Sequence, residues 1–247
     1  MTKSVALIPA RMASTRFPGK PLAKIHGYPM IEHVFRAVSA ATVLTDTFVA
    51  TCDIVIRDAV ESFGGRALIT GGHHERASDR CAEAIELLEK DGRFYDIVVM
   101  VQGDEPMTHP AQIDEVLAPF SDDSVEVVNL YSELTNDEAA SKNAVKVVVA
   151  QSGDALYFSR QPIPGSITSP VPPTGKQLGL IAFRTDALKR FSRLEPTPYE
   201  TCESVDMLRF LEHGMPVRMQ FTRHKTVAVD TIDDLEMVST MIVPPIW

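Results

Sequence analysis

The stretch YDIVVMV, residues 95–101, decides the fold class of this chain. Apart from Asp96 it is a short and continuous apolar run, which is the pattern of a β-strand buried on both faces. Strands of that kind occur almost only in sheets that carry helices above and below them. Residues 95–101 therefore predict an α/β protein.

Strand-like and helix-like segments alternate in the sequence that precedes this run. Strands are expected at residues 4–10, 46–52 and 66–70, and helices at 30–41, 56–64 and 78–90. Gly64 ends the second helix and Ser78 is expected to cap the third. Such alternation predicts a Rossmann-like, doubly wound, mostly parallel sheet with helices on both faces.

The second half of the chain is less regular. The expected strands are 126–134, 144–151, 217–222 and 226–230, and the expected helices are 135–143, 199–214 and 232–242. Residues 155–184 are rich in proline and glycine, so they predict a long loop between strands. We expect this insertion, about 155–185, to bind a ligand or to contact a partner subunit. Without a repeat or a linker, residues 1–247 are expected to form one domain.

Composition restricts the classes of function. The chain has 247 residues and a formal net charge of −9. Its hydrophobic fraction of 45% is ordinary for a soluble globular protein. The acidic balance argues against nucleic acid as a main partner. No apolar run reaches the roughly 18–20 residues that span a bilayer, and the start of the chain lacks signal-peptide features. We therefore expect a cytoplasmic protein with no membrane contact, and free thiols at Cys52, Cys81 and Cys202.

One loop collects cations although the chain as a whole is acidic. The stretch IPARMASTRFPGKPL, residues 8–22, contains Arg11, Arg16 and Lys20 and no acid. It leaves the carboxyl end of the first strand, where open α/β sheets bind their ligands. Arginine offers a fork that matches phosphate oxygens and lysine a compact charge. The loop therefore predicts a polyphosphate site, with a solvated connection as the alternative.

Two aspartates follow expected strands. Asp104, in the stretch VQGDEP, lies directly after residues 95–101 and is a natural ligand for Mg²⁺, which prefers a few carboxylates together with phosphate oxygens and water. Its alternative is a turn residue before Pro106. Asp230 stands where a strand gives way to a helix, so Asp230 or Thr231 could instead cap that helix.

Several stretches in a fixed order resemble the sugar-acid cytidylyltransferases, above all the 3-deoxy-manno-octulosonate (Kdo) cytidylyltransferases. They are IPARMASTRFPGKPL, VQGDEP, NAVKVV, ALYFSR, MLRFLEHG and VAVDTIDDL, and together they cover almost the whole chain. The resemblance implies a fold of the nucleotide-diphospho-sugar transferase type. It also implies transfer of CMP from CTP to the anomeric hydroxyl of a 3-deoxy-2-ulosonic acid with release of pyrophosphate, in lipopolysaccharide biosynthesis. Mg²⁺ and a homodimer are implied in the same way.

The resemblance also implies roles for individual residues. The catalytic group would be Arg11, Lys20, Asp104 and Asp230, with both aspartates holding Mg²⁺. The nucleotide would be bound by Pro9, Ala10, Arg11, Ser14, Arg16, Lys20, Ala77, Ser78 and Gln102. The sugar acid would be bound by Arg80, Gln102, Arg160, Gln177, Glu200 and Glu203. Glu200 and Glu203 fall on one helical face, for which a solvated face is the alternative.

The sequence also departs from the family pattern. Arg76, Ala77 and Ser78 stand where family members usually have Ser-Gly-Thr, and Ala77 adds a methyl group where the base approaches. Gln177 replaces a histidine and Ile181 an aromatic residue on the expected sugar side, which suggests an acceptor other than ordinary Kdo. Two alternatives stay open: a nucleotidyltransferase for a sugar 1-phosphate, and a catalytically idle paralogue that binds a nucleotide or sugar.

Overall fold

The computed structural model describes residues 2–14, 16–165 and 174–243. The chain divides into two compact units. The first comprises Met1–Asp114 with Lys225–Trp247, and the second comprises Glu115–His224. Each unit is described by itself below, and a single nucleotidyltransferase domain over residues 1–247 stays a prediction. None of the helices in the described ranges is long and apolar enough to cross a membrane.

The first unit is built on parallel strands. β1 (Ser4–Ala10) pairs with β4 (Asp46–Thr51) and with β6 (Ile97–Val101), and β4 pairs with β5 (Ala67–Ile69), all in parallel. Every residue of β1 and β6 is buried. The prediction made from residues 95–101 is therefore confirmed: β6 is a strand covered on both faces.

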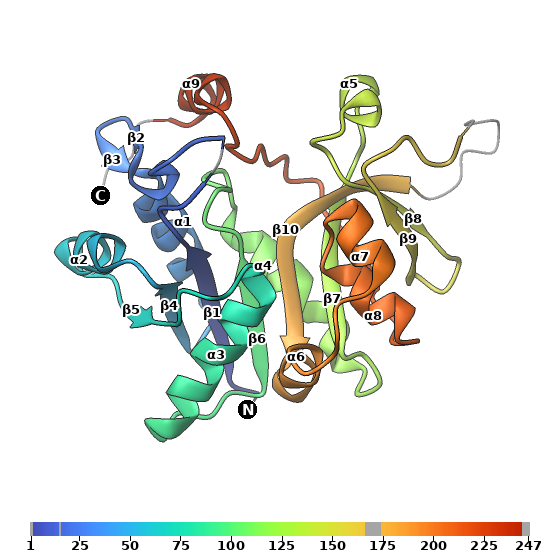
Figure 1. Cartoon of the computed structure of the whole chain (residues 1–247), viewed down its shortest axis with the longest axis horizontal. Coiled ribbons are helices and arrows are strands. Elements are labelled where there is room, and N and C mark those ends of the chain that lie inside the picture. Colours follow the sequence, from blue (N-terminus) through green and yellow to red (C-terminus); the bar gives the residue numbers. More distant parts are fainter. Residues whose placement is uncertain (1, 15, 166–173, 244–247) are drawn as a thin grey trace. The chain divides into compact units, whose positions relative to one another are not determined.

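The helices of the first unit follow from the order of its strands, β6-β1-β4-β5. Right-handed crossovers from β1 to β4 and from β4 to β5 place α1 (Met30–Ser39) and α2 (Ile54–Ser62) on one face. The crossover from β5 back to β6 runs in the opposite direction, so α3 (Ala77–Lys90) covers the other face (Figure 1). The doubly wound arrangement is confirmed, and its direction reverses between β1 and β6.

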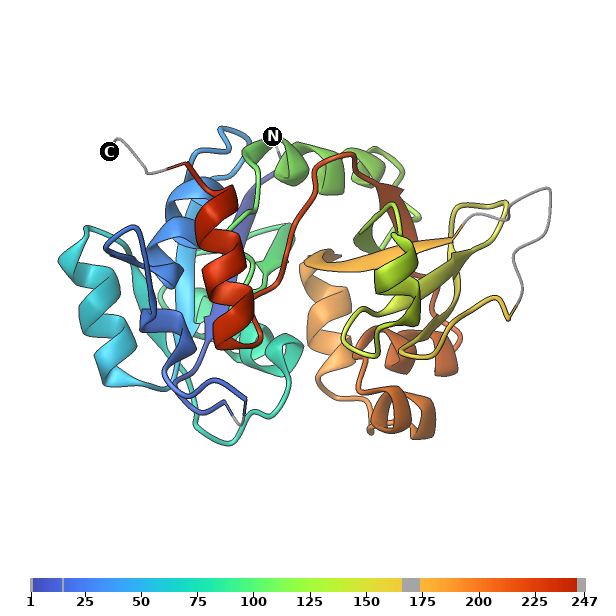
Figure 2. The same ribbon diagram turned by 90° about the horizontal axis from the view of Figure 1, so that it is seen from above.

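The C-terminal segment returns to the first unit. Residues 226–230 were expected to form a strand, but they join no sheet; the Val229 N–H instead donates to the Asp104 carbonyl (2.8 Å). α9 (Ile232–Met241) follows. Val229 and Val238 share a buried apolar cluster with Ile25 and Met30, so α9 lies against the start of the chain (Figure 2).

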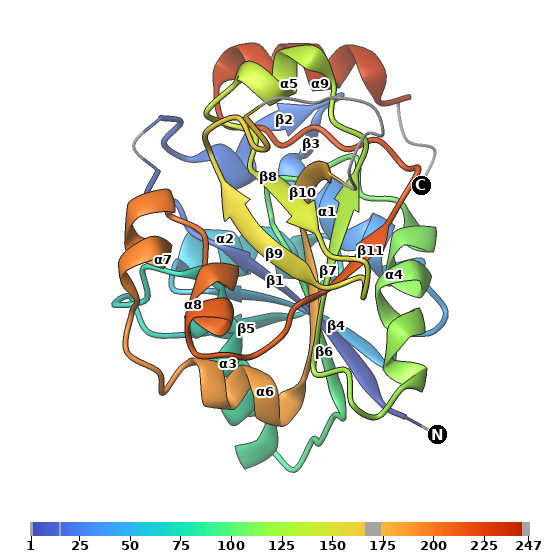
Figure 3. The same ribbon diagram turned by 90° about the vertical axis from the view of Figure 1, so that its right-hand side faces the viewer.

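The second unit contains a mixed sheet. β7 (Val127–Ser132) pairs in parallel with β11 (Arg218–Phe221) and antiparallel with β10 (Thr174–Arg184). β8 (Lys146–Val149) pairs antiparallel with β10 and with β9 (Ala155–Ser159), which lies beside it (Figure 3). The predicted long loop joins β9 to β10, and residues 166–173 of it lie outside the described residues.

Two helix predictions need correction. The expected helix 199–214 is two helices, α7 (Pro198–Glu203) and α8 (Met207–Glu212), because Ser204 adopts a left-handed backbone (φ 53°) and breaks the run. α3 begins at Ala77 with Arg76 at the N-cap position, so Ser78 lies inside the helix and does not cap it.

The remaining elements are short. The polar segment 135–143 forms α5 (Asn136–Ala140), as expected, with a capping box from Thr135 and Glu138. The sequence did not predict the other elements, since runs of two to eight residues carry little periodicity. These are η1 (Lys20–Leu22), β2 (Lys24–Ile25), β3 (Tyr28–Pro29), α4 (Pro110–Leu117), η2 (Ala118–Ser121) and α6 (Thr185–Phe191).

Candidate active site

A cavity of about 640 Å³ opens in the first unit at the carboxyl ends of β1 and β6. This is the point where the strand order reverses, and open α/β sheets bind ligands there. The cavity is lined by the loop after β1, the loop before α3, the turn after β6 and the C-terminal segment. The lining residues include Pro9, Ala10, Arg11, Ser14, Arg16, Lys20, Ala77, Arg80, Gln102, Asp104 and Asp230.

The loop after β1 is closed by two hydrogen bonds within the loop. The Gly19 N–H donates to the Met12 carbonyl (3.0 Å), and the Phe17 N–H donates to Ser14 Oγ (3.3 Å). Gly19 has φ +75°, a left-handed conformation that a side chain disfavours. These bonds fold the loop back so that Arg11 and Lys20, nine residues apart in sequence, line the same cavity.

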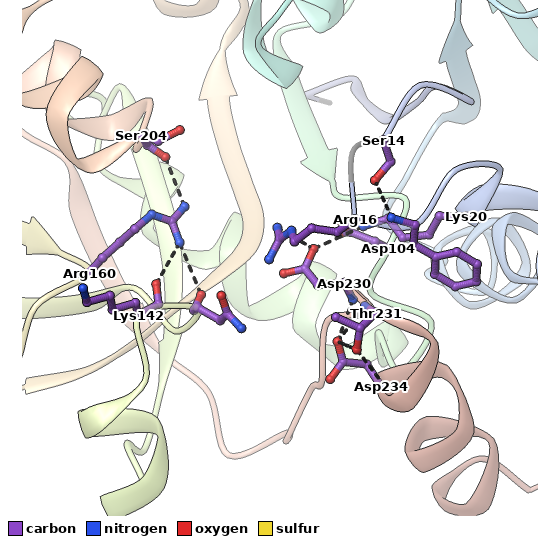
Figure 4. A network of polar contacts seen from close by, with 12 residues as sticks. Ser14, Arg16, Lys20, Asp104, Lys142, Arg160, Ser204, Asp230, Thr231 and Asp234 are labelled. Carbon is purple, nitrogen blue, oxygen red and sulfur yellow. Dashed lines mark hydrogen bonds and ion pairs between the residues drawn. The ribbon is translucent and has the colours of Figure 1, made fainter.

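Three of the predicted catalytic residues, Lys20, Asp104 and Asp230, meet in one ion-pair network together with Arg16 (Figure 4), while Arg11 lines the same cavity. Lys20 Nζ lies 2.6 Å from Asp104 Oδ2 and 3.3 Å from Asp230 Oδ1, and Arg16 Nη2 lies 3.0 Å from the same Asp230 oxygen. The Lys20 side chain is only 12% exposed, while each aspartate side chain is about one-quarter exposed. The structure thus brings together two carboxylates and two cations from three distant parts of the sequence.

The helix cap at the start of α9 leaves the Asp230 carboxylate available. Thr231 is the N-cap: its hydroxyl accepts from the Asp234 N–H (3.2 Å). The Asp234 carboxylate accepts in return from the Thr231 N–H (2.8 Å) and from the Asp230 N–H (3.0 Å). The capping alternative therefore applies to Thr231, and the side chain of Asp230 faces the cavity instead.

The turn after β6 requires glycine before Asp104. A Cβ atom on Gly103 would lie 2.9 Å from the Pro9 carbonyl oxygen, closer than real Cβ atoms approach. The two strand ends can therefore approach each other only because residue 103 has no side chain. Asp104 lies in this turn and also pairs with Lys20, so the turn reading and the site reading both hold.

α3 supplies the opposite wall of the cavity. Arg76 and Ala77 stand at its N-terminus, where the positive end of the helix dipole favours an anion. Arg80 is buried and lines the cavity, but its guanidinium donates to Thr70 Oγ1 (2.6 Å) and to the Gly71 and His74 carbonyls. Ser78 is 0% exposed and is absent from the lining, which corrects its prediction as a nucleotide ligand.

Glu83, one turn after Arg80, holds the same loop. Its carboxylate accepts from the Gly71 N–H (2.8 Å) and contacts the His74 ring. Burial of the carboxylate works to raise the pKa of Glu83, but the bonds from Gly71 and His74 outweigh burial and lower it. Arg80 and Glu83 together fix the loop before α3, so the cavity wall is rigidly positioned.

Arg160 and Glu203 of the second unit contact each other. The Arg160 guanidinium donates from Nε to the Glu203 carbonyl (2.7 Å), and its other nitrogens donate to the carbonyls of Lys142, Asn143 and Ser204 (Figure 4). The Glu203 carboxylate accepts from Ser159 Oγ and from the Arg160 N–H, both at 2.8 Å. These two predicted sugar ligands thus join the end of β9 to the end of α7.

Three other positions on the expected sugar side have structural partners. Glu200 is 0% exposed, and both its carboxylate oxygens accept from Arg209 (2.6 and 2.7 Å), so the prediction that it accepts sugar hydroxyls is corrected. Gln177 donates to Asn129 Oδ1 (2.6 Å) across the β10–β7 pair. Ile181 is a buried core residue, so its departure from the family pattern is a packing change.

Sequence reasoning missed two polar residues with clear structural roles. Lys146 is fully buried within β8, and its ammonium donates to the carbonyls of Ser141, Ala144 and Arg160; burial lowers its pKa. Its signal was a lone lysine in the apolar run VKVVV. Asp53 accepts from the Met12 N–H (2.7 Å), and its signal was an acid just after a strand.

The comparisons with known proteins bear directly on this site. A family model described as cytidylyltransferase matches residues 5–221. A 3-deoxy-manno-octulosonate cytidylyltransferase from Myxococcus xanthus is 45% identical over 242 residues, which cover 97% of this chain and 96% of that protein. This chain belongs to that family. The resemblance predicted from the sequence is confirmed, together with the fold class.

Other members of the family agree with the assignment. The 3-deoxy-manno-octulosonate cytidylyltransferase from Geobacter metallireducens is 42% identical over 249 residues, covering 96% of each chain. A solved structure of a CMP:2-keto-3-deoxy-manno-octonic acid synthetase complexed with CTP is 37% identical, with a TM-score of 0.89 over 97% of this chain and 98% of that one. The roles of individual residues are not tested by these similarities and stay predictions.

Proposed function

We propose that the protein transfers CMP from CTP to the anomeric hydroxyl of Kdo or a close relative, with release of pyrophosphate. One observation carries this proposal: a cationic loop and two carboxylates meet in one cavity of a Kdo cytidylyltransferase family member. Cations suit the triphosphate, and a carboxylate pair suits a metal beside it. The product, CMP-Kdo, would supply activated Kdo for lipopolysaccharide biosynthesis, as the resemblance to the family implies.

The cavity residues divide into triphosphate and base contacts. Arg11, Arg16 and Lys20 would hold the triphosphate, supported by the positive end of the α3 helix dipole. Pro9, Ala10, Ser14, Ala77 and Gln102 line the rest of the cavity and would contact the ribose and base. Arg80 would act mainly by shaping the wall, because its guanidinium is already bonded to the loop before α3.

Asp104 and Asp230 fit Mg²⁺ as a donor set. Mg²⁺ is usually held by one or two carboxylates together with phosphate oxygens and water. In the described ranges, no group of three or more His, Cys, Asp or Glu side chains could hold a metal, which agrees with a site completed by substrate. When bound, Mg²⁺ would neutralise phosphate charge and lower the pKa of the attacking hydroxyl.

Lys20 has a double role in this mechanism. Without ligand its ammonium neutralises both carboxylates, at 2.6 and 3.3 Å. A triphosphate gives the ammonium a second anionic partner, so Lys20 can turn from the aspartates toward phosphate. In-line nucleotidyl transfer then needs positioning and charge neutralisation and no covalent protein nucleophile. Arg16 and Lys20 would stabilise the pyrophosphate as it leaves.

Fewer observations support the residues proposed to bind the sugar acid. Gln102 lines the cavity at the end of β6 and remains a candidate ligand. In the second unit, Arg160, Gln177 and Glu203 remain candidates, although each already has a hydrogen-bond partner. We also propose that the protein acts in the cytoplasm as a homodimer, with the proline-rich loop before β10 and β10 itself as the contact. Light scattering on the purified chain measures its mass and tests the dimer.

The decisive experiment is pyrophosphate release with Mg²⁺ and each of the four NTPs, against a panel of free sugar acids that includes Kdo. We expect turnover with CTP and Kdo. Turnover only with another sugar acid would keep the mechanism and change the acceptor. Turnover only with a sugar 1-phosphate would replace the proposal by that alternative. Binding of CTP without turnover on any acceptor would identify an idle paralogue.

Asp104→Asn tests the metal assignment within the same assay. The substitution keeps the shape and removes the charge, so turnover should fall at least about a thousandfold, since metal charge stabilisation is worth several kcal/mol. The fold should persist, as measured by circular dichroism. Asp114→Asn is the matched control, because Asp114 is exposed on α4. Normal turnover in Asp104→Asn would refute the assignment of Asp104 as a metal ligand.

A further inference from the structure

Both backbone polar groups of Met12, its carbonyl and its N–H, are hydrogen-bonded. Its carbonyl accepts from the Gly19 N–H (3.0 Å), the bond that closes the loop after β1. Its N–H donates to Asp53 Oδ2 (2.7 Å), which belongs to a distant part of the chain. Arg11 and Ala13, the residues on either side of Met12, line the cavity. Met12 is therefore the point at which the loop is attached to the rest of the first unit.

The strand register explains why Asp53 reaches this peptide. β1 and β4 are parallel neighbours in which Ala10 is paired with Thr51, the last residue of each strand. Met12 and Asp53 each lie two residues further on, where the backbone ladder has ended. The bond from Met12 to Asp53 therefore continues the cross-strand attachment by one step after the ladder stops. The Asp53 N–H donates to Thr51 Oγ1 (3.1 Å), which fixes the position of Asp53 itself.

The Asp53 side chain does not cap the helix that begins directly after it. Asp53 is the N-cap residue of α2, where an aspartate usually accepts from the N–H groups of the first turn. Its side chain makes no such bond, although its backbone is in the extended conformation of a cap. The carboxylate turns away from its own helix and toward Met12. Loss of a cap costs stability, so the observed bond has a role outside α2.

We infer that Asp53 is a positioning residue for phosphate binding. It holds Met12, and through the Met12–Gly19 bond it sets the relation between Arg11 at the start of the loop and Lys20 at its end. Asp53 is not among the residues that line the cavity, so it acts through the loop and not on the ligand. Because a loop held in advance loses less freedom on binding, the bond strengthens affinity for the triphosphate. This inference rests on the proposed function for its ligand, CTP.

The test compares CTP binding in Asp53 variants by calorimetry, without any sugar acid. Asp53→Ala should bind CTP about ten- to a hundredfold more weakly, the usual effect of losing a hydrogen bond to a charged group. Asp53→Asn should recover most of the affinity, because its amide oxygen can accept the same bond. Asp58→Ala is the matched control, since Asp58 is on the same helix, exposed and paired only with its neighbour Arg57 in the bonds described. In turnover, KM for CTP should rise in Asp53→Ala while KM for the sugar acid stays unchanged.

Other outcomes are equally informative. Unchanged CTP affinity in Asp53→Ala, with unchanged hydrogen exchange of residues 11–14, would overturn the inference. A lower melting temperature with equal rises in both KM values would overturn it too, by indicating a purely structural residue. If Asp53→Ala does not fold, Asp53→Ser removes the carboxylate and can cap α2. If wild-type protein binds CTP but transfers nothing, the proposed function fails while the binding comparison still tests Asp53.

Discussion

The Asp46 carboxylate is held by two hydrogen bonds from neighbouring side chains in the first unit. It accepts from the Tyr95 hydroxyl at Oδ2 and from Arg66 Nη1 at Oδ1, both at 2.6 Å. Burial acts to raise the pKa of Asp46, but the bonds from Tyr95 and Arg66 outweigh it and lower the pKa. For Tyr95, burial and the bond to Asp46 act together and raise the pKa to about 12. The phenol therefore stays protonated well above its ordinary range.

Tyr95→Phe tests this pair through the pH dependence of stability. A pKa raised on folding stabilises the protein fully below the unfolded value of about 10, and this stability is lost as pH rises from 10 toward 12. The variant should therefore be about 1–2 kcal/mol less stable at pH 7, with a difference that shrinks above pH 10. Urea unfolding between pH 7 and 11 measures it, with Tyr199→Phe, at a half-exposed tyrosine, as control. Parallel curves would contradict the assignment.

α9 shows how the cap of a helix can position a carboxylate beside it. Asp234 accepts from the Asp230 N–H, the Thr231 N–H and the Thr231 hydroxyl. The same side chain thus completes the capping box and holds the backbone of Asp230. The element and the site are coupled, because the helix start that stabilises α9 also fixes a proposed metal ligand.

Asp234→Ala should therefore affect both stability and turnover. Loss of the cap should cost about 1 kcal/mol, and turnover should fall severalfold because the Asp230 backbone loses its acceptor. Asp233→Ala is the control, since Asp233 lies in the same turn and is exposed. Thermal unfolding and pyrophosphate release on both variants give the two readouts. Equal loss of activity in the two variants would refute the coupling.

α7 and α8 are joined by a buried ion pair. The Glu200 and Arg209 side chains are 1% and 4% exposed, and the Arg209 guanidinium also stacks 4.2 Å from the Phe191 ring. The pair accounts for the amphipathic pattern at residues 199–214 better than a sugar site does. Its function is to hold together two short helices that Ser204 separates.

Glu200→Ala should be strongly destabilising. It leaves the Arg209 charge buried without its carboxylate, which costs about 3–5 kcal/mol. Cys202→Ala, at an exposed position of the same helix, should change stability by less than about 0.5 kcal/mol. Urea unfolding compares the two variants, and a loss below 1 kcal/mol in Glu200→Ala would show that the pair is dispensable.

At the scale of the whole molecule, the parallel half was predictable and the rest only partly so. Residues 4–10 and 97–101 form continuous buried strands, and helices of nine or more residues join the parallel strands of this half, so the type and order of its elements could be predicted directly. The break between α7 and α8 at Ser204 could not be predicted, because no glycine or proline stands there. Residues 226–230 have the composition of a strand, but a strand needs a neighbour, and a single sequence does not show one.

The candidate site divides in the same way. Arg11, Lys20 and Asp104 were predictable because the carboxyl ends of parallel strands meet at one edge. The role of Asp53 depends on a bond to the backbone of a distant loop, and that of Arg80 on bonds to the loop just before its own helix; neither leaves a periodic signal. Glu200 was misassigned because an amphipathic pattern does not reveal whether a charged residue has a buried partner.

The charge of the whole chain sets the last prediction. A net charge of −9 repels CTP, while the cavity offers Arg11, Arg16, Lys20, Arg76 and Arg80 against Glu75, Asp104 and Asp230. Attraction is therefore local and electrostatic. The screening length falls from about 10 Å at 0.1 M salt to about 3 Å at 1 M, so affinity for CTP should fall on the order of tenfold over that range.

Cytidine supplies the control, because it has the same base and ribose but no phosphate. Its affinity should change little with salt, since only apolar and hydrogen-bond contacts remain. Calorimetric titrations of both ligands in KCl, with metal removed by a chelator, measure the difference. If the affinities of CTP and cytidine changed equally with salt, the cations of the loop would not bind phosphate. That result would refute the assignment of Arg11, Arg16 and Lys20 to the triphosphate.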